Sequence, residues 1–286
     1  MKKTGKLLMV LLLAVAVSFV MAAPSQAEVN DSDLGLELRG ALGAGQVLWG
    51  YVYYSSETGD FGTGPGGTLN LAALVSYKFI GLEANLLAGS TGDLEWTDED
   101  ISGNEVDFKS NGSGSYSVLD LKLGLNLFRE PGDMGHTFIY GGLRYWSTSR
   151  EQDTLEADGI EIPEYSGVDL EGNGSGWIVG FRDLSTIGAN DGFAIAIQTG
   201  FFFGKAPVDT FKVDGTKEDL TVNESATVGG ELAGGVALQN LGFLALAGFR
   251  GEVNATTFED SVAPTGEESA FGFGNITFFV EAQLQF

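Results

Sequence analysis

The sequence predicts an all-β fold, a single antiparallel up-and-down β-barrel that crosses a membrane with about ten strands. Three observations support this prediction. Apolar residues recur at every second position over long stretches, glycine is abundant while proline is scarce, and short links alternate with long ones. Alternation with period two is typical of a strand with one apolar face, whereas an amphipathic helix repeats about every 3.6 residues. Roughly eight or twelve strands remain alternatives.

The composition suits a barrel of this kind. The chain has 286 residues, enough for one barrel domain, and 43 of them are glycine. Glycine is unfavourable inside helices and common at turns, bulges and crowded sheet positions. There are 6 prolines, in keeping with long strands, because each proline removes a donor from the ladder. Cysteine is absent, which excludes disulfides, a thiolate nucleophile, cysteine metal sites and an acylated lipoprotein.

Residues 1–27 have the three parts of a secretory signal peptide. Lysines give it a positive start, residues 7–20 form an apolar run, and a Ser-Gln-Ala sequence ends at Ala27. We therefore expect cleavage after Ala27, with cleavage after Ala22 as the alternative. The apolar run is short for a membrane helix of about 20 residues. The mature chain, residues 28–286, is predicted to be one barrel domain.

The strands are located by alternation, segment by segment. Five leucines in residues 119–127 alternate with polar residues and glycine, and residues 69–79, 193–203, 228–238 and 276–286 alternate in the same way. Strands of about a dozen residues can cross a membrane at a tilt, whereas those of a soluble sandwich usually have about five or six. The predicted strands are 35–55, 68–79, 81–96, 114–128, 137–149, 175–186, 192–205, 226–239, 242–257 and 270–286.

The links between these strands alternate in length. Short turns at one end and long loops at the other are typical of transmembrane barrels, and an even strand count places both termini at the short-turn end. The long links are 57–67, 97–113, 150–174, 206–225 and 258–269. Aromatic residues near the strand ends are expected to form girdles at the two lipid boundaries. They are Tyr53, Tyr54, Tyr77, Phe79, Trp96, Phe128, Tyr145, Trp146, Trp177, Phe201 and Phe203.

The closing stretch, residues 278–286, places apolar residues at alternate positions and ends on an aromatic residue. Together with the signal peptide and the alternating strands, it resembles the small outer-membrane barrels of Gram-negative bacteria, the superfamily that includes outer-membrane proteins A and W. The resemblance implies that the barrel-assembly machinery reads this stretch as a signal. The residues of that implied assembly signal are Phe278, Val280, Ala282, Leu284 and Phe286.

If the apolar face of each strand meets lipid, the opposite face points into the lumen. We expect Lys122, Arg144 and Arg250 each to pair there with a carboxylate, since breaking a buried pair costs about 3–5 kcal/mol. A barrel of about eight strands is filled by side chains, and one of about sixteen leaves a channel. A mostly filled lumen is thus expected, with a polar path for a solute as the alternative. The predicted lumen charge network is Glu37, Arg39, Glu83, Asp120, Lys122, Arg144, Arg182, Glu231, Arg250, Glu252 and Glu281.

The chain is strongly acidic, with a formal net charge of −24. This charge disfavours nucleic-acid binding, which relies on lysine and arginine. Much of the acid falls in the long links, where it would suit divalent cations, basic partners or plain solvation. Residues 98–103 begin like an EF-hand loop, but the twelfth position is Lys109 instead of glutamate. Asp98 and Asp100 remain the candidate metal ligands.

Catalytic motifs are missing from the sequence. The single histidine, His136, falls in a predicted short turn, and neither G-x-S-x-G, H-E-x-x-H nor a Walker sequence occurs. We therefore expect neither an enzyme nor a cofactor. The function expected is an integral outer-membrane barrel, structural or a narrow porin-like channel. The alternatives are a surface adhesin or receptor acting through acidic loops and, third, a hydrolase. Expected partners are outer-membrane lipids, lipopolysaccharide, the assembly machinery and divalent cations.

Overall fold

A computed structural model describes most of residues 28–286 and none of residues 1–27, the predicted signal peptide. Ala27, the predicted end of that peptide, therefore lies outside the described residues, as do Tyr53, Tyr54, Phe128 and Asp100. The described residues are 34–52, 62–99, 104–127, 134–163, 166–188, 192–217, 220–260 and 268–286.

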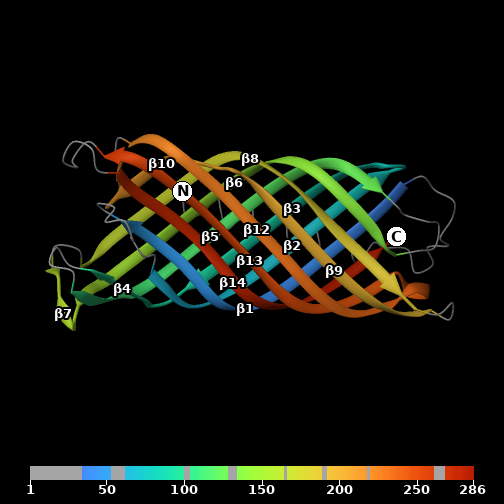
Figure 1. Cartoon of the computed structure of the whole chain (residues 1–286), viewed down its shortest axis with the longest axis horizontal. Coiled ribbons are helices and arrows are strands. Elements are labelled where there is room, and N and C mark those ends of the chain that lie inside the picture. Colours follow the sequence, from blue (N-terminus) through green and yellow to red (C-terminus); the bar gives the residue numbers. More distant parts are fainter. Residues whose placement is uncertain are drawn as a thin grey trace. The chain divides into compact units, whose positions relative to one another are not determined.

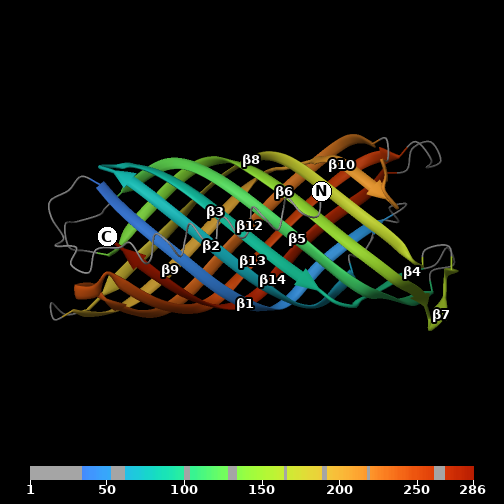
Figure 2. The ribbon, with the colours of Figure 1, turned by 180° about the vertical axis from the view of Figure 1, so that it is seen from behind.

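Long strands form one antiparallel sheet that closes on itself, as both side views show (Figures 1 and 2). Consecutive long strands pair with one another, and β14 pairs with β1 to complete the ring. The predicted all-β barrel is therefore confirmed. Its ten strands are β1 (Leu34–Val52), β2 (Gly62–Tyr77), β3 (Ile80–Thr91), β5 (Glu105–Leu127), β6 (His136–Ala157), β8 (Val168–Ile187), β9 (Phe193–Lys205), β12 (Leu220–Leu238), β13 (Phe243–Asp260) and β14 (Glu268–Gln285).

Smaller elements complete the described part of the chain. Four short strands extend the sheet at its long-link end: β4 (Leu94–Glu99), β7 (Ile160–Glu161), β10 (Val208–Val213) and β11 (Thr216–Lys217). A short 3₁₀ helix, η2 (Gln239–Leu241), makes the turn between β12 and β13. Among the described residues, there is no helix with the length and apolar character needed to cross a membrane.

The strands are strongly staggered around the barrel. Stagger and tilt are linked in a closed sheet, because the ladder must meet itself after one turn. If directly paired residues are traced from strand to strand once around the barrel, the path starts at one residue of β1 and returns to β1 at a residue more than half a strand away. It runs from Glu37 through Leu74, Glu83, Lys122, Gly142, Ile178, Gly204, Thr227, Asn254 and Phe273 to Trp49.

Each strand has an apolar outer face and a polar or mixed inner face, as the alternation predicts. On β14, for example, Ile276 and Phe278 are exposed on the outside, while Thr277 and Glu281 are buried inside. The outer apolar residues form a belt around the barrel. Aromatic residues predicted for the girdles are among its exposed members: Tyr77, Phe79, Tyr145, Trp177, Phe201 and Phe203.

The strands run further toward the long-link end than the sequence predicts. β5 begins at Glu105 instead of residue 114, and β6 continues to Ala157 instead of residue 149. Beyond the belt the outer face turns polar. Ser115 and Ser117, for instance, meet serine hydroxyls of β6 at 3.1 and 2.9 Å. The apolar alternation used to find strands therefore fades while the ladder goes on.

Much of the acid assigned to the long links consequently lies on strands. Asp107 is on β5, Glu151 and Asp153 are on β6, and Asp169 and Glu171 are on β8. These carboxylates therefore lie on the part of the hydrogen-bonded sheet that continues beyond the apolar belt.

Candidate functional site in the barrel lumen

Two layers of side chains fill the lumen. The first, here called the charged layer, consists of the eleven residues of the predicted lumen charge network and lies in the half of the barrel toward the short turns. The second, here called the aromatic layer, lies toward the long links. On β1 the order is evident, since Glu37 and Arg39 precede Trp49. The aromatic layer comprises Trp49, Tyr116, Trp146, Phe211, Phe258, Phe271 and Phe273.

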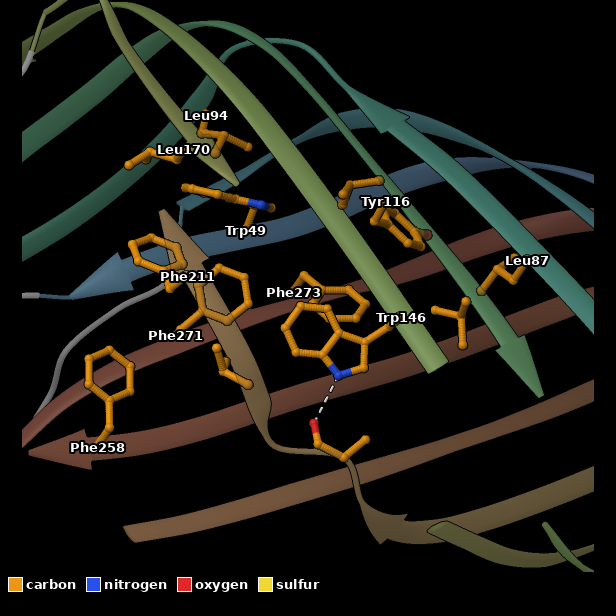
Figure 3. Packing of buried hydrophobic residues seen from close by; sticks show 14 residues of the cluster. Trp49, Leu87, Leu94, Tyr116, Trp146, Leu170, Phe211, Phe258, Phe271 and Phe273 are labelled. Carbon is orange, nitrogen blue, oxygen red and sulfur yellow. Dashed lines mark hydrogen bonds between the residues drawn. The ribbon is translucent and has the colours of Figure 1, made fainter. Parts of the chain in front are cut away.

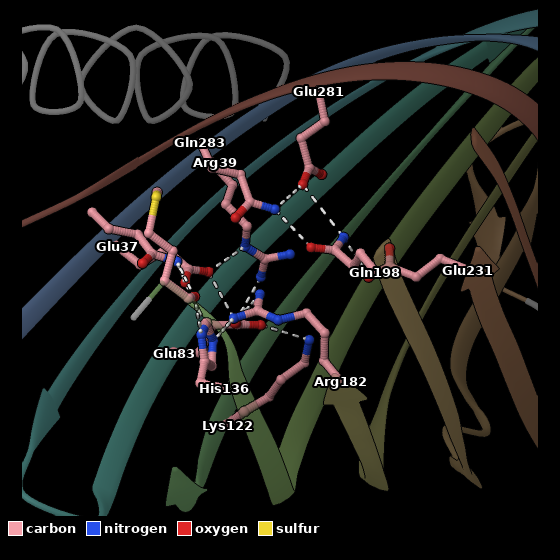
Figure 4. A network of polar contacts seen from close by, with 12 residues as sticks. Glu37, Arg39, Glu83, Lys122, His136, Arg182, Gln198, Glu231, Glu281 and Gln283 are labelled. Carbon is pink, nitrogen blue, oxygen red and sulfur yellow. Dashed lines mark hydrogen bonds and ion pairs between the residues drawn. The ribbon is translucent and has the colours of Figure 1, made fainter. Parts of the chain in front are cut away.

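Glu83 of β3 is the hub of the charged layer, and its side chain is 2 % exposed. Its carboxylate accepts hydrogen bonds from Arg39 Nη2 at 2.6 Å, Lys122 Nζ at 2.9 Å and Arg182 Nη1 at 3.0 Å. Arg182 also reaches Glu37, with Nη2 2.7 Å from Oε1. These side chains come from β1, β3, β5 and β8, and Figure 4 shows them converging on Glu83. Three cations thus share one buried carboxylate.

Among the other members of the charged layer, Arg144 and Arg250 each pair with a carboxylate on a neighbouring strand, and Glu252 of β13 reaches across the lumen to Arg144 of β6 at 3.5 Å. Arg144 donates from Nε and Nη2 to the two oxygens of Asp120, both at 2.8 Å. Arg250 donates to Glu231 from Nε at 3.0 Å and lies 3.5 Å from Glu281. The structure thus places all eleven predicted residues inside the barrel, each in an ion pair with another member of the layer. Lys122, Arg144 and Arg250 each have the carboxylate neighbour that we expected.

Aromatic rings cover several of these cations. The guanidinium groups of Arg144 and Arg250 lie 4.6 and 4.7 Å from the ring centroids of Phe202 and Phe279. Such contacts stabilise a desolvated cation by about 2 kcal/mol. The sequence analysis did not include these rings, although each has the parity of an inward polar residue on its strand, and Phe202 shares that of Gln198. Phe279, for example, shares the parity of Glu281.

Lys122→Ala tests the pairing directly. The substitution removes one of the three donors to Glu83 and the ring contact with Tyr140 at 4.8 Å. We expect the barrel to lose about 3–5 kcal/mol of stability and its melting temperature to fall clearly. Thermal unfolding of the refolded protein in detergent, followed by circular dichroism, measures this. An unchanged melting temperature would contradict a structural role for the pair.

The position of His136 differs from the one that the sequence predicted. The residue was expected to be a turn residue, but it is the first residue of β6 and its side chain points into the lumen, 5 % exposed. Its Nε2 lies 3.3 Å from Oε2 of Glu37 and 3.2 Å from Nη2 of Arg182. The physical reason is parity, since His136, Phe138 and Tyr140 occupy the same inner face.

The aromatic layer fills the lumen on the long-link side of the charged layer, and Figure 3 shows its rings gathered together. The ring centroids of Trp146 and Phe273 are 5.0 Å apart, and those of Trp49 and Phe271 are 5.8 Å apart. Buried indoles need acceptors, and here Trp146 Nε1 donates to the carbonyl of Ala206 at 2.9 Å. Phe211 belongs to β10, which follows β9 in the chain and pairs with β8. Its side chain points into the aromatic layer and packs on Phe271.

Trp146 was predicted for the outer girdle, and the structure places it inside with 3 % exposure. Its neighbour Tyr145 is the girdle residue, 45 % exposed. Parity again gives the reason, because Trp146 alternates with Tyr145 and shares the face of Arg144. Trp96 was also predicted for the girdle, but its ring stacks on that of Phe108 at a centroid distance of 5.3 Å. Both residues lie in the part of the sheet that extends beyond the apolar belt at the long-link end.

A cavity of about 50 Å³ with a mixed polar and apolar lining lies within the charged layer. Members of the charged layer line it together with Asn70 and Asn85. The candidate calcium ligands are elsewhere. Asp98 belongs to β4, but its side chain and the whole of Asp100 lie outside what the structure describes. Among the described residues, acidic and histidine side chains nowhere gather in threes that could hold a metal ion.

The implied assembly signal is displayed on β14. Phe278 and Val280 are 49 % and 58 % exposed on the outer face, and Ala282 is exposed beside them. Leu284 is partly buried, and Phe286 follows the last residue of the strand.

No family model and no curated protein sequence matches the chain. Among solved structures, the outer membrane protease OmpT of Escherichia coli has 10% sequence identity and a TM-score of 0.52, covering 92% of this chain and 99% of its own. The translocator domain of the autotransporter NalP of Neisseria meningitidis has 11% identity and a TM-score of 0.37, covering 89% of each chain. At sequence identities this low, the likeness shows similarity of fold alone. The chain has the fold of the outer-membrane β-barrels of Gram-negative bacteria.

Proposed function

We propose that this protein is an integral outer-membrane β-barrel with a lumen sealed by its own side chains, serving a structural or surface role. The observation that carries the proposal is the pair of layers in series. Buried ion pairs centred on Glu83 fill one level, and packed rings around Trp146 fill the next. The cavity of about 50 Å³ between charged side chains has room for a few water molecules.

The outer surface supports a lipid environment. Leu42, Leu123 and Phe249 are 68 %, 61 % and 63 % exposed, and apolar belts of this extent are unfavourable in water. Export would use the predicted signal peptide, cleaved after Ala27. The partners proposed are membrane lipids and lipopolysaccharide around the belt, and the barrel-assembly machinery at the exposed face of β14. The acidic surface argues against nucleic acid.

The strand extensions favour surface binding as the second candidate function. Arg150, 1 % exposed, joins three segments there by donating to the carbonyl oxygens of Gly92 and Ser110. The outer surface of the sheet beyond the belt carries exposed acidic residues on adjacent strands, such as Glu151 and Asp169. A basic partner or bridging divalent cations would suit this surface.

We further propose that the protein is not an enzyme. A hydrolase would need a general base near open solvent, whereas His136 is buried and contacts Glu37 and Arg182. The structural likeness to a protease does not bear on this point, because it concerns the fold.

Conductance in a planar bilayer tests the sealed lumen. We expect the refolded mature protein to give no steady openings at neutral pH, since both layers block the path. Folding must be established independently by circular dichroism of the same preparation. Steady openings would overturn the sealed barrel and favour the narrow porin-like channel, with the cavity as part of its path.

A further inference from the structure

The charged layer is not electrically balanced by its own side chains. In the described residues it contains six carboxylates, of Glu37, Glu83, Asp120, Glu231, Glu252 and Glu281, and five cations, of Arg39, Lys122, Arg144, Arg182 and Arg250. One negative charge is therefore left over while His136 is neutral. An uncompensated charge in a desolvated interior is strongly unfavourable, so a further positive charge is required.

Two carboxylates share their cation with another carboxylate: Glu281 at Arg250 and Glu252 at Arg144. Glu281 also accepts hydrogen bonds from the side-chain amides of Gln198 and Gln283, so Glu252 is the less compensated of the two. Among the described residues, the ion-pair partner of Glu252 is Arg144, at 3.5 Å. Arg144 is already held by both oxygens of Asp120 at 2.8 Å, so two carboxylates share one guanidinium. Protonation of His136 would not correct this, because it contacts Glu37 and Arg182, where cations are already in excess.

Oxygen atoms in need of a partner surround the same place. Asn70 is 7 % exposed, and its Oδ1 has no hydrogen-bond donor among the described residues; the same holds for Oδ1 of the partly buried Asn85. Both asparagines line the cavity of about 50 Å³ together with Asp120 and Glu252. Asn85 lies directly opposite Asp120 in the β3–β5 ladder. Buried acceptors without donors are unfavourable and are usually satisfied by water or an ion.

We propose that this cavity binds one sodium ion, through the carboxylate of Glu252 and the amide oxygens of Asn70 and Asn85. Oxygen ligands of these types are those that hard cations take. One monovalent charge balances the layer, whereas a divalent ion would overcompensate it. The volume accommodates the ion with one or two waters, each of which needs about 10–15 Å³. The inference does not depend on whether the barrel conducts.

Thermal unfolding in different salts tests the site. The refolded mature protein is melted in detergent at constant ionic strength while sodium chloride replaces choline chloride, whose cation is too large for the cavity. A ligand that binds the folded state raises its stability with the logarithm of concentration. We expect the melting temperature to rise by about 3–5 °C for each tenfold increase in sodium above its dissociation constant. Equal melting temperatures in the two salts would overturn the proposal.

Two variants identify the ligand. Glu252→Gln keeps the shape of the side chain and removes the excess charge, so the dependence on sodium should disappear. Glu171→Gln is the control, because Glu171 is an exposed carboxylate outside the charged layer, and its variant should retain the sodium response. Equal responses in both variants would contradict the assignment, as would a stability that depends on pH but not on sodium.

A direct measurement on the unmodified chain remains informative if a variant fails to fold. Crystals soaked in a thallium(I) salt should give an anomalous peak between Asn70, Asn85 and Glu252. A cavity without such a peak, or one filled by water alone, would overturn the proposal.

Discussion

Replacing Glu83 by glutamine should cause the largest loss of stability of any single lumen substitution. Arg39, Lys122 and Arg182 all donate to this one carboxylate, and the substitution leaves their charges with far less compensation inside the barrel. Removing one partner of a single buried pair costs about 3–5 kcal/mol, so the loss here should be at least that large. Denaturant unfolding in detergent micelles, followed by far-ultraviolet circular dichroism, measures it.

A matched exposed pair provides the control. Glu171 and Lys212 lie 3.4 Å apart on the outer surface, and the Glu171 side chain is 51 % exposed. Exposed pairs contribute about 0–1 kcal/mol, so Glu171→Gln should change stability little. Combining Glu83→Gln with Lys122→Met should recover part of the loss, since one surplus charge is removed. Additive losses in the double variant would show that the two residues do not act as a pair.

Replacing Trp146 by alanine should give the second large effect. Its ring packs on Phe271 and Phe273 at centroid distances of 5.7 and 5.0 Å, and its indole nitrogen holds Ala206. Removing a buried tryptophan costs about 3–5 kcal/mol, and the same unfolding experiment measures it. The variant should nevertheless remain silent in a planar bilayer, because the charged layer still closes the lumen. Steady conductance would mean that the aromatic layer alone forms the seal.

Trp177 offers a control of the same residue type. It is 45 % exposed on the outer face of β8, so Trp177→Ala leaves the lumen packing intact. Its loss of stability should be much smaller than that of Trp146→Ala. Similar losses would indicate that the fold responds to the loss of any tryptophan and not to a cavity in the lumen.

Alternation was sufficient to predict the barrel within the apolar belt and insufficient beyond it. In the belt, lipid outside and side chains inside impose opposite demands on neighbouring residues, so leucines alternate with Asp120 and Lys122. Beyond the belt the outer face is polar, as at Ser113 and Ser115 of β5, so leucines no longer recur at every second position there. The ladder continues because it is held by backbone hydrogen bonds, which leave little trace in the sequence.

The alternation of inward and outward residues along each strand could have identified more of the lumen residues. It placed all eleven residues of the charged layer, because charged residues are unfavourable on the lipid face. Trp146 and His136 were misassigned, since an aromatic residue is acceptable on either face and His136 stands at the edge of a strand. The partners of His136, Glu37 and Arg182, come from other strands, and no local pattern connects residues so far apart.

The pairing of β14 with β1 joins the two ends of the barrel chain. Until that seam forms, β1 and β14 each present a row of unpaired backbone donors and acceptors, which hydrocarbon does not tolerate. Deleting β14 would therefore remove much more than one strand's share of the ladder, because it would leave an open sheet unable to remain in lipid. Closure of the sheet and stable residence in the membrane are therefore expected to be coupled for this protein.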